Sequence, residues 1–221
     1  MEWKEQLKQW RSEKPLTYKP REGLVMPQAL VERVSHFTED NAIVVTDVGQ
    51  HQMWASQFYE FKEPRTLLTS GGLGTMGYGL PAALGAQVGC PDQQVVLFSG
   101  DGGFMMNCQE LVTIANLGLP VKAFILNNQV LGMVAQWQRM FYNGHYSHSN
   151  LEGHGDFVKL AEAMGVKGLQ ITKPEEVDEV IQKALAEPGP VVVDVKIPFD
   201  ENVLPMVPAG GRLDQMIMGG E

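Results

Sequence analysis

The sequence is poor in cysteine and contains no long hydrophobic run. Cys90 and Cys108 are the only cysteines among 221 residues, and each lies in an apolar stretch. Two separated cysteines do not make a disulfide framework, so we expect free thiols in a reducing compartment. No apolar run reaches the length of a membrane span, and Met1–Lys14 is charged and lacks a hydrophobic centre. We therefore predict no membrane partner and no secretory signal.

Positive charge is also scarce. The chain has 17 Lys and Arg residues against 26 Asp and Glu residues, which gives a formal net charge of −9. An acidic chain repels polyanions, so nucleic acid is excluded as a partner. An acidic protein can still bind a small phosphate ligand, but it needs a local device such as a metal ion or a helix N-terminus. A phosphate-binding site in this chain would therefore lie at a metal ion or at the N-terminus of a helix.

The chain divides into three segments by composition. Residues 1–22 contain an amphipathic helix, with Trp3 and Trp10 on one face, followed by a linker that is rich in proline. Residues 23–200 carry alternating helix and strand signals, and residues 201–221 form a tail. Two tryptophans on a short helix need a surface to pack against, so we expect the sequence to be preceded by another domain.

The middle segment predicts an α/β fold. Apolar strands that alternate with helices indicate a doubly wound, mostly parallel six-stranded sheet with helices on both faces. The expected strands are Ala42–Val48, Thr66–Thr69, Gln94–Ser99, Val121–Leu126, Leu169–Ile171 and Pro190–Ile197. The expected helices are Pro27–Phe37, Tyr78–Val88, Asn107–Asn116, Val130–Phe141, Phe157–Met164 and Pro174–Ala186.

Ligands of such sheets bind beyond the carboxyl ends of the strands. One strand ends in Gly100-Asp101-Gly102-Gly103, and the next strand ends in Asn127-Asn128. Glycines allow a sharp turn with exposed N–H groups, while a carboxylate and an amide oxygen suit Mg²⁺. Gly-Asp-Gly by itself is first of all a turn sequence. Because neighbouring parallel strands end at the same edge, we expect Asp101 and the asparagines to form half of a magnesium site.

These motifs resemble the signature of enzymes that depend on thiamine diphosphate (ThDP). In that signature Gly-Asp-Gly and Asn-Asn are separated as they are here, by residues 103 to 126. The surrounding sequence is similar to the catalytic subunit of acetohydroxyacid synthase in particular, from about Met26 onward. The segments that carry this resemblance are Asp47–Trp54, Ser70–Pro81, Leu131–Trp137 and Val203–Pro208.

The resemblance implies roles for individual residues. Asp101 and Asn128 would bind Mg²⁺ through their side chains, and Val130 would bind it through its carbonyl. Met76 resembles the residue that holds ThDP in its bent conformation, and no catalytic residue is expected in this segment. The positions that match the cofactor-binding residues of the family are Gly49, Gln50, His51, Gly74, Met76, Gly100, Asp101, Gly102, Gly103, Asn128, Val130, Gly132 and Met133. Val134 and Trp137 resemble residues of the substrate channel.

The resemblance also implies a reaction and its partners. Family members decarboxylate pyruvate and join the hydroxyethyl unit to a second 2-ketoacid, either pyruvate or 2-ketobutyrate. The products are precursors of branched-chain amino acids. The family uses ThDP, Mg²⁺ and FAD, and its activating glutamate lies in another domain of a neighbouring subunit. We therefore expect a second catalytic subunit in a homodimer or homotetramer, a regulatory small subunit, and a cytoplasmic location in a bacterium or a plastid in a plant.

Other interpretations stay open. Gly72-x-Gly74-x-x-Gly77 also fits a dinucleotide fingerprint, although this leaves the second glycine turn and the asparagines unexplained. A polar loop carries His145, His148 and His154, whose spacing matches no standard zinc pattern. Met76, Met133 and Trp137 could be plain core residues, and His51 could be structural. The chain could also be a diphosphate-binding module without turnover, or belong to another ThDP-dependent decarboxylase or carboligase.

Overall fold

The computed structural model describes residues 2–153 and 155–218, which form two compact units. One unit comprises residues 2–20 and 204–218, and the other is Arg21–Val203. The first contains helix α1 (Glu2–Glu13), which confirms the predicted amphipathic helix, and a short 3-10 turn η2 (Leu213–Gln215). Trp3 and Trp10 pack edge to face with ring centroids 5.5 Å apart, and both remain largely exposed.

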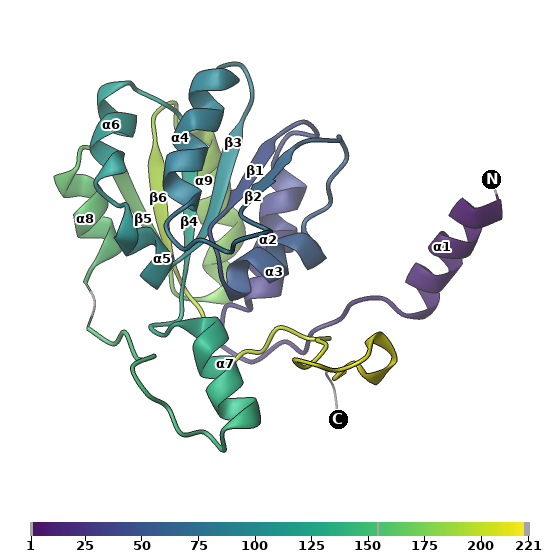
Figure 1. Ribbon diagram of the computed structural model, residues 1–221. Coiled ribbons are helices and arrows are strands. Elements are labelled where there is room, and N and C mark those ends of the chain that lie inside the picture. Colours follow the sequence, from purple (N-terminus) through teal and green to yellow (C-terminus); the bar gives the residue numbers. More distant parts are fainter. Residues whose placement is uncertain (1, 154, 219–221) are drawn as a thin grey trace. The chain divides into compact units, whose positions relative to one another are not determined.

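The larger unit is built on a six-stranded sheet in which every strand runs parallel to its neighbours (Figure 1). The strand order is β2-β1-β3-β4-β6-β5. The strands are β1 (Ile43–Thr46), β2 (Leu67–Thr69), β3 (Val95–Gly100), β4 (Lys122–Asn127), β5 (Lys167–Ile171) and β6 (Val191–Lys196). The predicted parallel sheet of six strands is therefore confirmed. Gly100 at the end of β3 pairs with Leu126 in β4, so both strands end at the same edge.

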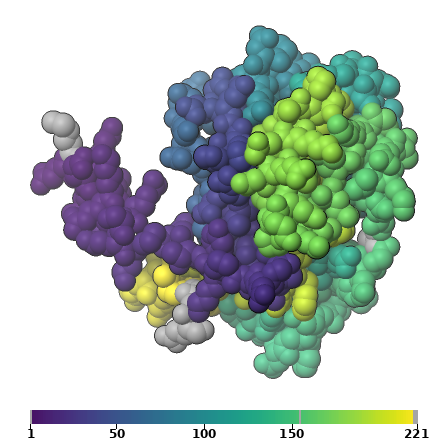
Figure 2. Space-filling model, turned by 180° about the vertical axis from the view of Figure 1, so that it is seen from behind, coloured from purple at the N-terminus to yellow at the C-terminus, as the bar shows by residue number. Residues whose placement is uncertain are grey.

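Helices cover both faces of this sheet. On one face lie α4 (Gly79–Gly89), α5 (Asp101–Met106), α6 (Glu110–Asn116) and α8 (Phe157–Ala163). On the other lie α2 (Pro27–Phe37), α3 (Gln50–Phe58) and α9 (Val177–Ala186), which follows the short 3-10 turn η1 (Pro174–Glu176). Figure 2 shows α2 and α9 side by side on this second face, where Arg33 and Asp178 join them by two hydrogen bonds of 2.7 and 2.8 Å. Helix α7 (Gly132–Phe141) follows β4 at the carboxyl edge.

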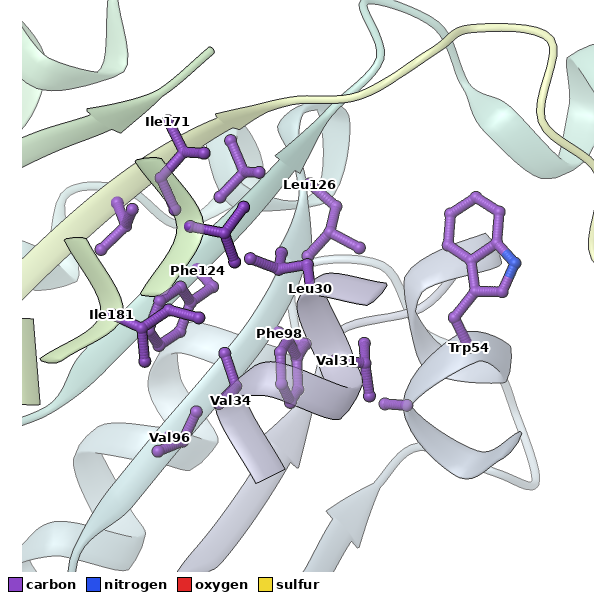
Figure 3. Close-up of a cluster of buried hydrophobic side chains, with 14 of the residues drawn as sticks. Leu30, Val31, Val34, Trp54, Val96, Phe98, Phe124, Leu126, Ile171 and Ile181 are labelled. Carbon is purple, nitrogen blue, oxygen red and sulfur yellow. The ribbon is translucent and has the colours of Figure 1, made fainter. Parts of the chain in front are cut away.

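The core forms because the four central strands, β1, β3, β4 and β6, are buried on both faces. Alternate residues of β3 and β4 project to opposite sides, so Phe98 and Phe124 pack toward α2, α3 and α9. Leu97 and Ile125 pack toward α4, α6 and α8. Figure 3 shows the first of these clusters, with Trp54 of α3 at its edge near the carboxyl ends of the strands. Continuous runs of β-branched and aromatic residues are typical of parallel strands covered on both faces.

Two helices were not predicted from the sequence. Helix α3 begins at Gln50, and α5 begins at Asp101, directly after the strands where loops were expected. Glycine disfavours helices in isolation, and α5 contains Gly102 and Gly103. Packing overrides this preference, because Trp54 and Phe104 are buried against the sheet. Within the described residues, no helix is long and apolar enough to cross a membrane.

Candidate functional site

A cleft lies at the carboxyl edge of the sheet, where α3, α5 and α7 begin. It is a narrow cleft of about 70 Å³, lined mainly by residues that follow β1, β3 and β4. The predicted site residues that line it are Gly49, Gln50, His51, Met76, Gly100, Asp101, Gly102, Gly103, Asn128, Val130, Gly132, Met133 and Val134. Gly74 and Trp137 are not among the lining residues.

Asp101 connects the ends of β3 and β4. Its carboxylate is nearly buried and accepts hydrogen bonds from the backbone N–H groups of Gly102 at 2.9 Å and Gln129 at 2.8 Å. Burial raises the pKa of the Asp101 carboxyl to about 6, and the two hydrogen bonds oppose that rise. The carboxylate is therefore ionised at neutral pH. Its burial still makes the charged form less stable, and a bound cation would offset that penalty.

Asn128 lies beside this carboxylate at the end of β4, as the topology predicted. Its Nδ2 donates to Oε1 of Gln50 at 3.2 Å, and its Oδ1 accepts the N–H of Val130 at 3.2 Å. Gln129, between them, has a φ of 59°, so the chain turns sharply after the strand. This turn brings the Asp101 carboxylate, the Asn128 amide and the Val130 backbone to the same cleft.

These oxygens suit a hard divalent cation that also binds phosphate. In residues 2–153 and 155–218, no group of three or more His, Cys, Asp or Glu side chains could hold a metal ion. A site with one carboxylate leaves coordination positions for water and for phosphate oxygens, which is how proteins usually bind Mg²⁺. His145 and His148 are within the described part and form no such group, while His154 lies outside it.

His51 presents an unsatisfied polar atom beside the cleft. Its Nε2 is buried and has no hydrogen-bond partner among the residues that the structure describes. Burial lowers the pKa of the His51 imidazole to about 4, although the neighbouring Asp47 opposes this shift, so the ring is neutral at pH 7. A buried polar atom without a partner carries an energetic penalty. The ring therefore has hydrogen-bonding capacity that a polar ligand in the cleft would satisfy.

Comparison with known proteins agrees with this geometry. The family model "Thiamine pyrophosphate enzyme, C-terminal TPP binding domain" matches residues 47–195.

The chain belongs to this family.

Its relatives include acetolactate synthases. The chain is 46% identical to acetolactate synthase 1, chloroplastic, of Nicotiana tabacum, over 99% of this chain and 34% of the relative. It is 45% identical to the mitochondrial acetolactate synthase catalytic subunit of Saccharomyces cerevisiae, over 98% of this chain and 32% of the relative. The chain spans about a third of the length of these curated relatives. The similarity to acetohydroxyacid synthase, which is the same enzyme as acetolactate synthase, is therefore confirmed.

Membership of this thiamine pyrophosphate enzyme family favours ThDP over a dinucleotide as the ligand. The glycines from Gly72 to Gly77 lie between β2 and α4, as the dinucleotide hypothesis required. Asp101, however, is held by the backbone of Gly102 and Gln129 in a second strand-end turn. The family match extends across that turn and β4, so the dinucleotide hypothesis is set aside.

The glycines around the cleft are needed partly by the protein's own packing. A Cβ on Gly49 or Gly100 would come within 3.0 Å of the His51 ring. A Cβ on Gly103 would lie 2.5 Å from Oδ1 of Asp47, closer than real Cβ contacts. Because these residues are glycines, the backbone at the start of α5 can approach both Asp47 and His51 closely.

Asp47 is an organising residue to which the sequence analysis assigned no role of its own. Its buried carboxylate accepts backbone N–H groups from Val48 at 2.7 Å, Gly77 at 3.0 and 3.1 Å, and Gly79 at 2.8 Å. It thereby ties the end of β1 to the glycine-rich loop and to the start of α4. Met76 precedes Gly77 directly, so Asp47 positions the backbone that carries Met76 to the cleft. The signals in the sequence were its place at the end of a predicted strand and at the start of the Asp47–Trp54 segment.

The remaining predicted residues lie in the loop before α4 and on α7. Gly74 has a φ of 64°, which favours glycine, and lies in the loop that carries Met76. Trp137 packs edge to face against Phe141, with ring centroids 5.4 Å apart. Val134 lines the cleft and is half-exposed. The exposed face of α7 therefore continues from the cleft toward solvent.

Proposed function

We propose that this chain holds the diphosphate of ThDP through Mg²⁺ at the carboxyl edge of its sheet. The Asp101 carboxylate, the Asn128 side-chain oxygen and the Val130 carbonyl would hold the metal ion. The observation that carries the proposal is the hydrogen bond of 2.8 Å between the Gln129 N–H and Asp101, because it joins the ends of β3 and β4 around one cleft. Residues 23–200 would be the cofactor-binding domain.

The neighbouring residues would bind the rest of the cofactor. His51 would satisfy its buried Nε2 with a diphosphate oxygen, while Gly49, Gln50, Gly102 and Gly103 would approach the diphosphate through their backbones. The first turn of α3 opens on the cleft, where the helix dipole favours an anion.

Other residues would support the rings of the cofactor. Met76 would support its bend, and Met133 would contact the aminopyrimidine. Gly74, Gly100 and Gly132 would give the backbone the close approach that binding needs. When bound, ThDP supplies the electron sink that stabilises a carbanion after loss of carbon dioxide.

We further propose that the reaction is that of acetolactate synthase. Pyruvate would be decarboxylated and its two-carbon unit joined to pyruvate or 2-ketobutyrate, with Val134 and Trp137 shaping the substrate channel. The names of the relatives support this choice over other ThDP-dependent enzymes. FAD, the activating glutamate, a second catalytic subunit and a regulatory subunit would come from outside this segment. The protein would function in the bacterial cytoplasm, or in a plastid if it comes from a plant.

Calorimetry of the 221-residue chain with ThDP and Mg²⁺ tests the binding proposal. We expect ThDP to bind and thiamine monophosphate to bind much more weakly, because the monophosphate lacks the second phosphate that would complete the metal site. Equal affinity for the two compounds would contradict the proposal.

A turnover assay tests whether the chain acts alone. With pyruvate, ThDP, Mg²⁺ and FAD, we expect no acetolactate from the isolated chain, since the activating glutamate is not part of it. Formation of acetolactate would show that the segment is an enzyme by itself, and not only a binding module.

A further inference from the structure

Three buried amide side chains connect the segment after β6 to the cleft. Gln136 of α7 is fully buried, and its orientation is set by the backbone of Val203. The Val203 N–H donates to Oε1 of Gln136 at 2.8 Å, and the Val203 carbonyl accepts from Nε2 at 3.1 Å. A backbone N–H can only donate and a carbonyl can only accept, so the oxygen and nitrogen ends of Gln136 are distinguished.

The side-chain oxygen of Gln136, fixed in this way, sets the orientation of Gln50. Its Nε2 donates to Oε1 of Gln136 at 2.8 Å and to the backbone carbonyl of Glu201 at 2.8 Å. Both partners are acceptors at these contacts, so the nitrogen of Gln50 must face them. The oxygen of Gln50 consequently faces the opposite way, toward Asn128.

Asn128 is the third of these amide side chains, and we call the series Gln136–Gln50–Asn128 the amide relay. The oxygen of Gln50 needs a donor, and Nδ2 of Asn128 lies 3.2 Å away. The Asn128 oxygen is then directed to the other side, where it accepts the Val130 N–H at 3.2 Å and keeps a second lone pair. If the relay were reversed, Asn128 would present an NH₂ group, which cannot bind a cation.

Gly132 gives a separate indication that these amide groups meet at this point. A Cβ on Gly132 would lie 2.1 Å from Oε1 of Gln50 and 2.9 Å from Nδ2 of Asn128. Even the smallest side chain at this position would therefore occupy the space of the Gln50–Asn128 hydrogen bond. The hydrogen bond between Gln50 and Asn128 fits at the start of α7 because residue 132 is a glycine.

We propose that Gln136 and Gln50 are positioning residues that orient Asn128 so that its oxygen, and not its nitrogen, faces the bound Mg²⁺. This inference rests on the proposed metal site. It assigns Gln50 a side-chain role in addition to the backbone contact proposed above, and it assigns a role to Gln136, which touches neither the metal nor the cofactor.

Replacement of Gln136 tests the relay in solution. Gln136→Met keeps the length of the side chain and removes its polarity, so Gln50 and Asn128 lose their fixed orientation. We expect the dissociation constant of Mg²⁺, measured by calorimetry at saturating ThDP, to rise about 10- to 100-fold, as it does when residues that support metal ligands are lost. At saturating Mg²⁺ the affinity for ThDP should change little. Gln136→Glu, whose protonated form retains a carbonyl acceptor toward Gln50, should restore most of the Mg²⁺ affinity.

Gln87 provides a matched control. It is an equally buried glutamine, and its Nε2 donates to the carbonyls of Cys90, Pro91 and Gln93, away from the cleft. Gln87→Met should lower the free energy of unfolding without changing Mg²⁺ affinity. Wild-type Mg²⁺ affinity in Gln136→Met, or an equal loss in Gln87→Met, would overturn the proposal.

Neutron diffraction from the deuterated, ligand-free chain tests the orientation directly. It distinguishes ND₂ from oxygen, and we expect ND₂ of Asn128 to face Gln50. The opposite orientation would overturn the relay even if every variant folds poorly. If the wild-type chain binds no Mg²⁺ with ThDP, the proposed function fails, while the neutron map still decides whether the relay exists.

Discussion

Replacing Asp47 with asparagine should destabilise the larger unit strongly, although the change is isosteric. The buried carboxylate accepts hydrogen bonds from three backbone N–H groups, and each of its oxygens makes two of the four contacts. In either orientation the new NH₂ group replaces an oxygen and faces the N–H of Val48 or Gly79. One buried donor loses its partner, and the other hydrogen bonds lose their charge, which together costs about 3 kcal/mol.

Urea denaturation of wild type and Asp47→Asn measures this loss, and thermal unfolding should show a Tm lower by about 6–12 °C for a unit of this size. Asp178→Asn is the control, because its half-exposed ion pair with Arg33 is a surface contact worth less than about 1 kcal/mol. If Asp47→Asn costs no more than Asp178→Asn, Asp47 does not organise the glycine-rich loop.

Two further changes test other parts of the structure. Gly103→Ala would place a methyl group 2.5 Å from Oδ1 of Asp47, so we expect a loss of about 1–3 kcal/mol in urea denaturation; an unchanged midpoint would be inconsistent with the close packing. Burial lowers the pKa of Lys122 from 10.5 to about 8, while its Nζ donates to the carbonyls of Glu187 and Gly189. The folded state then binds fewer protons than the unfolded state between about pH 8 and 10.5. The free energy of unfolding of the wild type should therefore rise with pH in that window relative to that of Lys122→Met. Parallel pH profiles of the two proteins would refute this.

The sheet could be predicted because its central strands contain continuous apolar runs bounded by glycine or polar residues. The strand expected at Gln94–Ser99 is β3 (Val95–Gly100), with its ends shifted by one residue. The helices α3 and α5 were missed because each begins at or near glycines, which have low helix propensity. Their stability comes from tertiary packing of Trp54 and Phe104, which local patterns do not report.

The site was predictable only where topology alone brings residues together. Asp101 and Asn128 follow neighbouring strands, so a parallel sheet places them at one edge. The contacts of Asp47 and the amide relay depend on loops and helices that approach each other after the sheet has formed. Gln50, Gln136 and Val203 lie in three separate segments that resemble the family, but nothing in those segments indicates that the three residues bind one another.

The central claim is that Asp101 holds the metal ion that binds the cofactor diphosphate. Calorimetric titration of ThDP into wild type and Asp101→Ala, each with Mg²⁺ and with EDTA, tests it most directly. We predict that wild type binds ThDP only when Mg²⁺ is present, and that Asp101→Ala does not bind it under either condition. Folding of the variant is checked by its urea transition. Equal ThDP affinity of wild type and a folded Asp101→Ala in Mg²⁺, or undiminished wild-type binding in EDTA, would contradict the account.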